Sequence, residues 1–252
     1  MKRQLRMSWF HLRQFVSVPY FIQLMVITTV TTTLIQLLAS HAWGGITPTE
    51  GWVRGGVIGT WTTATCAAGI IGFERYKGTL VHLVLAPVGA LRSLAAVVCS
   101  AASFGLAALP LAWATWALFT WSVDFTPLGG LAVLRLAAGA LMLLAGSIIL
   151  SLVVAAVFVL TPNAIAYEGL LLVPVFVTSG ILFTSTAAPA GLDSMSRFLP
   201  LLTPYELLLD RPVSDLALGT WLLVTLCWLV IAVFLGRRAL RLATTAGTLE
   251  VL

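Results

Sequence analysis

The stretch Phe73-Glu74-Arg75-Tyr76-Lys77-Gly78-Thr79-Leu80 is a short charged island in a chain that is otherwise almost continuously apolar. Phe73, Tyr76, Leu80 and Leu83 are spaced by three and four residues, so they would share one face of a helix. Pro87 predicts the end of that helix, because proline disrupts the hydrogen bonds of a helix interior. The pattern therefore predicts an amphipathic helix over residues 73–87 at a membrane surface, between two spans.

The composition identifies lipid as the solvent of this chain. Hydrophobic residues make up 60% of its 252 residues and charged residues only 9%, with a mean hydropathy of +1.03. A soluble domain carries about a quarter of its residues as charged side chains. We therefore expect a single transmembrane domain over residues 1–252, without an attached soluble enzyme. The pI near 9.6 could suggest nucleic acid as a partner, but membrane topology explains the basic residues and no nucleic-acid partner is expected.

Six apolar runs are long enough to cross about 30 Å of hydrocarbon as helices. They are Tyr20–Ala39, Trp52–Gly72, Leu91–Phe119, Leu131–Leu160, Ala164–Ala188 and Leu216–Leu235. The third and fourth are longer than a span requires, so we expect them to tilt, to protrude, or to bend near Pro110. The predicted fold class is an all-α membrane protein with six transmembrane helices.

The basic residues predict the orientation of these spans, because cytoplasmic loops carry an excess of Lys and Arg. With the N-terminus inside, ten of the 14 Lys and Arg residues fall on the cytoplasmic side and four fall outside. The inner ten are Lys2, Arg3, Arg6, Arg13, Arg75, Lys77, Arg92, Arg237, Arg238 and Arg241. The outer four are Arg54, Arg135, Arg197 and Arg211. We expect a multi-pass protein of the plasma membrane with both termini in the cytoplasm.

The N-terminal segment 1–16 has the pattern of a helix that lies flat on an anionic leaflet. Leu5, Trp9, Leu12 and Val16 are spaced by four, three and four residues, and basic residues lie between them. The alternative is a frayed basic tail.

The outer segment 187–215 is the longest predicted loop. Five proline or glycine residues interrupt it, yet it keeps many Leu, Met and Phe residues. We expect short helices that dip into the outer membrane face and return, as a re-entrant hairpin before the last span.

Catalytic and metal-binding patterns are lacking in this sequence. His11, His41 and His82 lie outside the predicted spans or at their ends, so a Ser–His pair within the membrane is not expected. No Gly-x4-Gly-Lys-Ser/Thr loop is present, so this chain would hold no ATP of its own. The three cysteines have no partner at metal-ligand spacing. We expect no catalytic residue, no metal site and no cofactor on this chain.

Small hydroxyl residues form two polar stripes on the first two predicted spans. The candidates for a substrate path are Thr29, Thr32, Thr33 and Gln36 on the first span, and Thr60 and Thr63 on the second. Such residues line a cavity or let helices pack closely with hydrogen bonds between them, and we favour packing. Gly51, Gly55 and Gly59 form a ridge for close contact, either within the chain or across a dimer.

Residues 73–88 resemble the first cytoplasmic loop of type-2 ABC transporter permeases. The order that carries the resemblance is Glu-Arg, two residues, Gly-Thr-Leu, a Leu three positions on, and Ala-Pro-Val at 86–88. The layout of spans resembles that family over the whole chain. Thr178-Ser179-Gly180 and Thr203-Pro204-Tyr205 also resemble it, although Thr203 stands where the family often has Asn.

The resemblance implies that residues 73–87 are the coupling helix that binds an ABC ATPase subunit. The residues it assigns to coupling are Glu74, Arg75, Lys77, Gly78, Thr79, Leu80, Leu83 and Pro87. It further implies a second permease subunit, as a homo- or heterodimer, in membrane lipid, with ATP and Mg on the ATPase. The implied function is outward transport of an amphipathic drug, antibiotic, peptide, lipid or glycan.

Three alternatives remain at this point. Residues 73–87 could be an ordinary interfacial helix of an unrelated membrane protein, or the chain could be a secondary carrier or channel without an ATPase. The chain could also be a membrane scaffold or enzyme without a transport function. Ion-driven carriers usually hold ionisable residues deep in their spans, and this sequence shows few.

Overall fold

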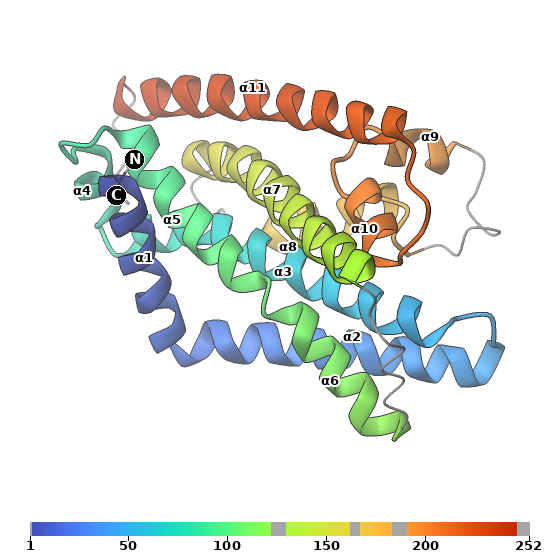
Figure 1. The fold of residues 1–252 in the computed structure, drawn as a ribbon. Helices are drawn as coiled ribbons and strands as arrows, with labels where there is room; N and C mark the ends of the chain where they lie inside the picture. Colours follow the sequence, from blue (N-terminus) through green and yellow to red (C-terminus); the bar gives the residue numbers. More distant parts are fainter. Residues whose placement is uncertain (1, 122–129, 162–166, 183–190, 246–252) are drawn as a thin grey trace.

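The computed structural model describes residues 2–121, 130–161, 167–182 and 191–245. Every element in this part of the chain is an α-helix, which confirms the predicted all-α fold class (Figure 1). The helices are α1 (Lys2–Ser17), α2 (Pro19–Trp43), α3 (Pro48–Tyr76), α4 (Leu80–Val84), α5 (Ala90–Gly105), α6 (Ala108–Thr120), α7 (Gly130–Leu160), α8 (Glu168–Thr178), α9 (Leu192–Ser196), α10 (Leu202–Leu208) and α11 (Asp215–Thr245).

Four helical stretches in the described residues are long and apolar enough to cross a membrane. They are Pro19–Trp43, Ala90–Thr120, Ala132–Leu160 and Asp215–Thr245. They coincide with the first, third, fourth and sixth predicted spans. The chain therefore has the character of a transmembrane protein.

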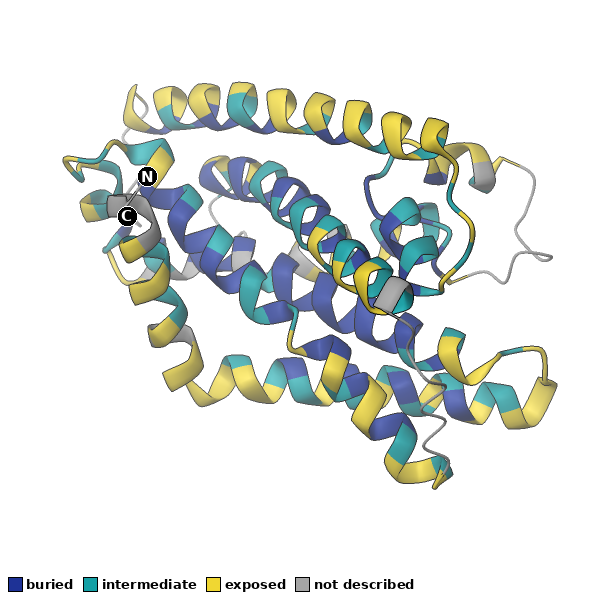
Figure 2. Ribbon diagram, in the orientation of Figure 1, coloured by how far each residue is buried: buried dark blue, intermediate teal, exposed yellow. Residues whose placement is uncertain are grey.

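The second predicted span coincides with α3, which is 29 residues long but richer in Gly and Thr than the four stretches above. This helix lies in the middle of the bundle and is the most buried long helix (Figure 2). Val53, Val57 and Trp61 are fully buried within it. α3 packs against α2, α5, α6 and α7. Because its surface faces other helices and not lipid, small side chains that allow close contact are favoured over large apolar ones.

The fifth predicted span, Ala164–Ala188, lies partly outside the described residues. Its described helix is α8, which has 11 residues. At 1.5 Å per residue this helix is about 17 Å long, which is roughly half of the hydrocarbon thickness.

The third predicted span bends between α5 and α6, close to the position expected from Pro110. Pro110 has no N–H to offer the carbonyl of Leu106, which instead accepts a bond from the Leu109 N–H at 3.2 Å. The Gly105 carbonyl at the break accepts a hydrogen bond from the Thr60 hydroxyl at 3.0 Å. The polar group exposed by the bend is thus satisfied by the neighbouring helix.

The predicted amphipathic helix over 73–87 is not continuous, and this corrects the sequence interpretation. Its first turn is the end of α3, and its second part is the separate five-residue helix α4. Gly78 interrupts it with φ +72°, a left-handed conformation that ends helices and suits glycine. As expected, the helix ends before Pro87, which lies in the turn between α4 and α5.

The predicted N-terminal helix over 1–16 corresponds to α1, which packs against α5. Trp9 and Phe10 are 67% and 65% exposed. This amphipathic helix therefore offers aromatic side chains outward, as a helix at a membrane interface does.

The described part of segment 187–215 contains two short helices, α9 and α10, at the end of the bundle opposite α4 (Figure 1). Leu201 and Tyr205 are buried there, and α10 packs against α7. The indole N–H groups of Trp221 and Trp228 on α11 donate to the carbonyls of Pro200 and Phe198, at 3.1 and 2.7 Å. These contacts attach the segment to the bundle. Residues 187–190 lie outside the described residues.

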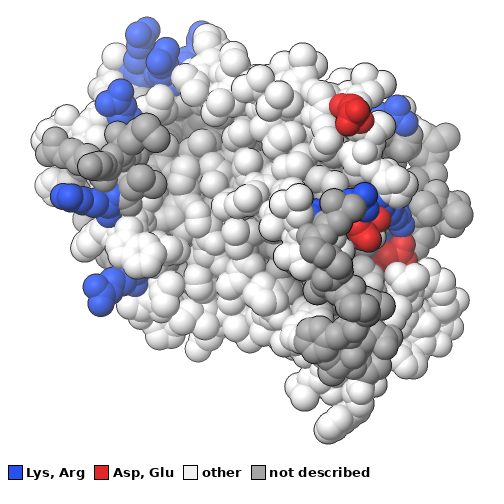
Figure 3. All heavy atoms as spheres, viewed as in Figure 1, with Lys and Arg blue, Asp and Glu red and all other residues white. Residues whose placement is uncertain are grey.

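Charged side chains gather at the two ends of the molecule on the face shown in Figure 3, with an uncharged band between them. The end with α4 carries Lys and Arg, whereas the other end carries both signs. At that second end, Arg211 pairs with Glu50 at 2.6 Å and Arg135 pairs with Asp210 at 2.8 Å. The start of α1 and the end of α11 both lie at the α4 end (Figure 1).

Candidate functional site

The turn between α3 and α4 is a well-formed helix C-cap. The Thr79 N–H donates to the Glu74 carbonyl and the Gly78 N–H donates to the Arg75 carbonyl, both at 2.9 Å. This is the pair of bonds of a Schellman motif, with Gly78 in its left-handed position. The Thr79 hydroxyl also donates to the Glu74 carboxylate. Glu74, Gly78 and Thr79 therefore form one small unit that sets the angle between α3 and α4.

Arg75 connects this turn to the end of α7. Its guanidinium donates to the carbonyl of Thr161 at 2.8 Å and to the carbonyl of Val159. The Val159 carbonyl lies in the last turn of α7 and the Thr161 carbonyl directly after it; the C-terminal end of a helix leaves acceptors unsatisfied and favours a cation. Burial lowers the pKa of Arg75, but a guanidinium stays charged at neutral pH.

Arg75 is only 3% exposed. Glu74 and Arg75 were expected to hold the segment against its neighbouring helices and against an ATPase. Arg75 does bond to the end of α7, and Glu74 bonds to Thr79 within the turn. The pair thus stabilises the turn, and a contact of either residue with another subunit stays a prediction.

The remaining residues of the predicted coupling set fall into two groups. Leu80 is fully buried, and Leu83 packs against the same core. Lys77, Gly78 and Pro87 are exposed. The exposed group forms an accessible surface beside α4, and Leu80 anchors that surface to the bundle.

The core around Leu80 joins four long helices. This core contains Ile71 of α3, Leu94 of α5, Phe158 of α7 and Ala239 of α11. A displacement of α4 would therefore be transmitted to all four helices, since packed interiors deform little.

The threonine stripe on α2 lies in the contact between α2 and α3. Thr29 and Thr33 are buried, and Thr33 donates its hydroxyl proton to the Thr29 carbonyl at 2.7 Å. A Cβ added at Gly59 would overlap Thr29, and one added at Gly55 would overlap Thr33. The glycine ridge is thus a contact within the chain, which favours the packing interpretation; a role in a substrate path stays a prediction.

Thr32 and Gln36 lie at the edge of the same contact. The Thr32 hydroxyl bonds to the carbonyl of Thr28 at 2.7 Å and lies 3.5 Å from that of Gly55. The Gln36 side chain accepts a hydrogen bond from Arg54 at 2.9 Å.

Thr60 and Thr63 are both buried on α3, but they differ in what they bind. The Thr60 hydroxyl bonds to Gly56 of its own helix and to Gly105 across the α5–α6 break. The Thr63 hydroxyl bonds to Gly59 of its own helix, at 2.8 Å.

Thr60→Val is expected to lower the stability of the protein by about 1 kcal/mol, because valine keeps the shape and removes an interhelical hydrogen bond. Thr63→Val is the matched control and is expected to change stability by a few tenths of a kcal/mol. Thermal unfolding in detergent measures both. A larger loss of stability in Thr60→Val than in Thr63→Val supports a packing role. Altered substrate dependence of a partner ATPase, without a change in stability, would instead show that these side chains line the substrate path.

Arg54 is a buried residue that sequence reasoning counted only as an outer charge. It is 3% exposed, and its Nε has no hydrogen-bond partner. Its described partner is the neutral amide of Gln36. Its position directly after Trp52 and Val53, inside an apolar run, is the signal that could have indicated burial, since arginines in spans face the protein interior.

The part of the chain that the structure describes holds no cluster of three or more His, Cys, Asp or Glu side chains suited to a metal ion, and Cys99 and Cys227 are free thiols. The chain matches no protein-family model and no curated protein sequence. Functional inference therefore rests on the geometry above and on the resemblance in residues 73–88.

Proposed function

We propose that this chain is the membrane-spanning permease subunit of an ATP-driven ABC exporter. The cargo would be an amphipathic drug, antibiotic, peptide, lipid or glycan. ATP and Mg would be held by a separate ATPase subunit, and a second permease subunit would complete the pathway. The chain would lie in the plasma membrane with both termini in the cytoplasm.

The observation that carries the proposal is the α3–α4 turn. Lys77 and Gly78 of this turn are exposed, and so is Pro87 in the following turn between α4 and α5, at the end of the molecule rich in Lys and Arg (Figure 3). Behind this surface, Arg75 holds the end of α7 and Leu80 lies in the four-helix core. An ATPase bound here would push on an element that is connected to α3, α5, α7 and α11.

The proposed topology has six crossings, with α3 as the second and the segment containing α8 as the fifth. The chain leaves α7 beside Arg75, at the α4 end, and reaches α9 and α10 at the opposite end (Figure 1). The segment between them, which includes α8, therefore connects the two ends of the bundle. This course supports an even number of crossings.

In the proposed mechanism the ATPase drives alternating access. Closure of two ATPase subunits on ATP would move the α3–α4 turn, and the four-helix core would carry that movement into the spans. Rigid-body movement of packed helices is a common form of such transitions. In this mechanism the chain contributes the α3–α4 turn and the transport pathway, and the partner subunit hydrolyses ATP.

The proposal is tested by purifying the tagged chain from its native membrane and identifying what accompanies it. We expect a soluble ATPase to copurify, and ATP-dependent outward movement of cargo in liposomes that contain both subunits. ATP-independent flux by the chain alone would contradict the proposal and favour a carrier or channel.

Gly78→Val and Glu74→Ala are expected to reduce transport per ATP hydrolysed at least about tenfold while leaving the chain folded. Valine at φ +72° is strained by about 1–2 kcal/mol, which shifts the turn without removing core contacts. Gly219→Ala on α11, where a Cβ meets nothing within 4 Å, is the control. Transport and ATP hydrolysis are measured on the same liposomes, and normal coupling in both variants would exclude the turn as the transmitting element.

A further inference from the structure

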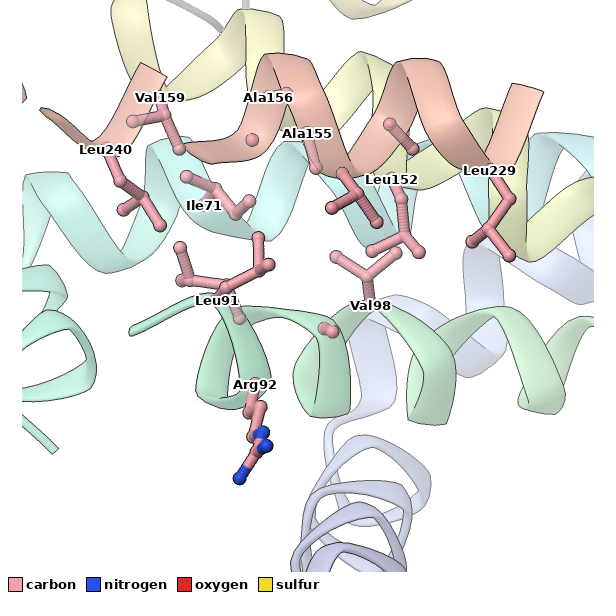
Figure 4. A pocket seen from close by; sticks show the side chains of 15 residues that line it. Ile71, Leu91, Arg92, Val98, Leu152, Ala155, Ala156, Val159, Leu229 and Leu240 are labelled. Carbon is pink, nitrogen blue, oxygen red and sulfur yellow. The ribbon is translucent and has the colours of Figure 1, made fainter. Parts of the chain in front are cut away.

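A cavity of about 220 Å³ lies between α5, α7 and α11, with Ile71 of α3 on its wall (Figure 4). Of the 15 residues that line it, 14 are apolar or glycine and one is Arg92. Water needs two or more polar partners in a buried site, and Arg92 is the one lining residue with a polar side chain. An empty space would forfeit dispersion contacts along its walls. The cavity therefore suits an apolar occupant.

Small side chains create this space. Ala155 and Ala156 of α7 and Ala232 of α11 line it. At Gly236, α11 comes so close to α5 that an added Cβ would lie 2.9 Å from the Leu91 side chain. The two helices thus touch at Gly236, and the alanines leave room beside that contact.

The cavity has the depth of one membrane leaflet. On α11 its lining runs from Leu240 to Leu229, which is about 16 Å at 1.5 Å per residue. This is roughly half of a 30 Å hydrocarbon core. On α5 the lining runs from Leu91, in the first turn, to Val98, two turns deeper. The cavity therefore extends from the basic end of the molecule toward its middle.

Two exposed arginines lie on or directly beside lining residues at the shallow end of the cavity. Arg92 is exposed, and Figure 4 shows its side chain pointing away from the apolar interior. Arg237 directly follows Gly236 on α11 and is also exposed. An apolar slot with cations at headgroup depth is complementary to an anionic lipid, because basic pockets between spans bind lipid phosphates.

We propose that this cavity binds one acyl chain of an anionic phospholipid, whose phosphate interacts with Arg92 and Arg237. The site is separate from the α3–α4 turn and does not depend on an ATPase partner. Its four-helix wall shares Ile71, Leu94 and Val159 with the core around Leu80. A bound lipid would therefore stabilise the helices that the turn is proposed to move.

Native mass spectrometry of the purified chain with phosphatidylglycerol or phosphatidylcholine tests the site. We expect one phosphatidylglycerol to be retained per chain, and the Arg92→Gln/Arg237→Gln double variant to bind it roughly thirtyfold more weakly. Arg238→Gln is the control, because Arg238 lies about 200° around the helix from Gly236. Equal retention of phosphatidylcholine, or equal losses in the control and the double variant, would overturn the proposal.

A second variant tests whether the acyl chain lies in the cavity. Ala232→Leu fills the cavity and is expected to displace the lipid without lowering the unfolding temperature measured in lipid-free detergent. Ala114→Leu, on the exposed side of α6, adds the same carbon atoms outside the cavity and is expected to leave lipid retention unchanged. Undiminished phosphatidylglycerol binding by a folded Ala232→Leu variant would show that the acyl chain lies elsewhere.

Discussion

Arg75→Leu is expected to lower the free energy of unfolding by roughly 3 kcal/mol or more, because hydrogen bonds to a charged group contribute about 1.5–3 kcal/mol each. The substitution leaves the carbonyls of Val159 and Thr161 without the guanidinium that now binds them. It also removes the tie between the α3–α4 turn and α7. Both the unfolding temperature and the coupling of transport to ATP hydrolysis should fall.

Arg75→Lys separates the charge from the geometry. A lysine keeps the cation near the end of α7 but cannot donate two bonds in the fixed fork of a guanidinium, so an intermediate stability is expected. Arg238→Gln on the exposed side of α11 controls for the loss of a cation at the same end of the molecule. If Arg75→Leu unfolded at the same temperature as this control, Arg75 would not be a structural tie.

Gly55→Ala and Gly59→Ala are expected to destabilise the bundle by about 2–3 kcal/mol each, as overpacking of a close contact does. A Cβ at Gly55 would lie 3.0 Å from the Thr33 Cα, which cannot move without shifting α2. A Cβ at Gly59 would lie 2.9 Å from the Ala108 Cβ on α6 and would also overlap Thr29.

The matched control is Gly219→Ala on α11. An added Cβ meets nothing within 4 Å there, so the helix preference of alanine should leave stability unchanged or raise it by up to about 1 kcal/mol. Denaturant titration in detergent compares the three variants. Equal stability of all three would mean that α2 and α3 are not in close contact along the ridge.

Most of the helical layout could be predicted from apolar runs, because a helix that faces lipid has to be apolar along its length. The four apolar stretches were predicted for this reason, whereas the amphipathic helix α1 was predicted from the spacing of its apolar residues. The prediction of one continuous helix from Phe73, Tyr76, Leu80 and Leu83 was wrong. Residue spacing alone does not show where the backbone leaves the helical conformation, as it does at Gly78. Gly78 was the residue that could have indicated it, since glycine after a helical turn is the usual left-handed cap.

The role of Arg75 could not be predicted from local pattern. Its acceptors on Val159 and Thr161 lie more than eighty positions along the chain, and only the packing of α3 on α7 brings them together. The same holds for Thr60, whose acceptor on Gly105 becomes free only because the chain breaks between α5 and α6. The glycine ridge was predicted as a contact surface, but its partner, the α2 threonine stripe, is known only from the fold.

The central position of α3 has a consequence for how the protein is made. A helix rich in Gly and Thr that also carries Arg54 near its outer end partitions less well into lipid by itself than the apolar α2 does, since ionisable side chains within a span disfavour insertion. Only residues 44–47 separate α3 from the apolar α2, whose Gln36 bonds to Arg54. During synthesis the two helices should leave the translocon together as a hairpin, so that α2 acts as an intramolecular chaperone for the helix around which the others later assemble.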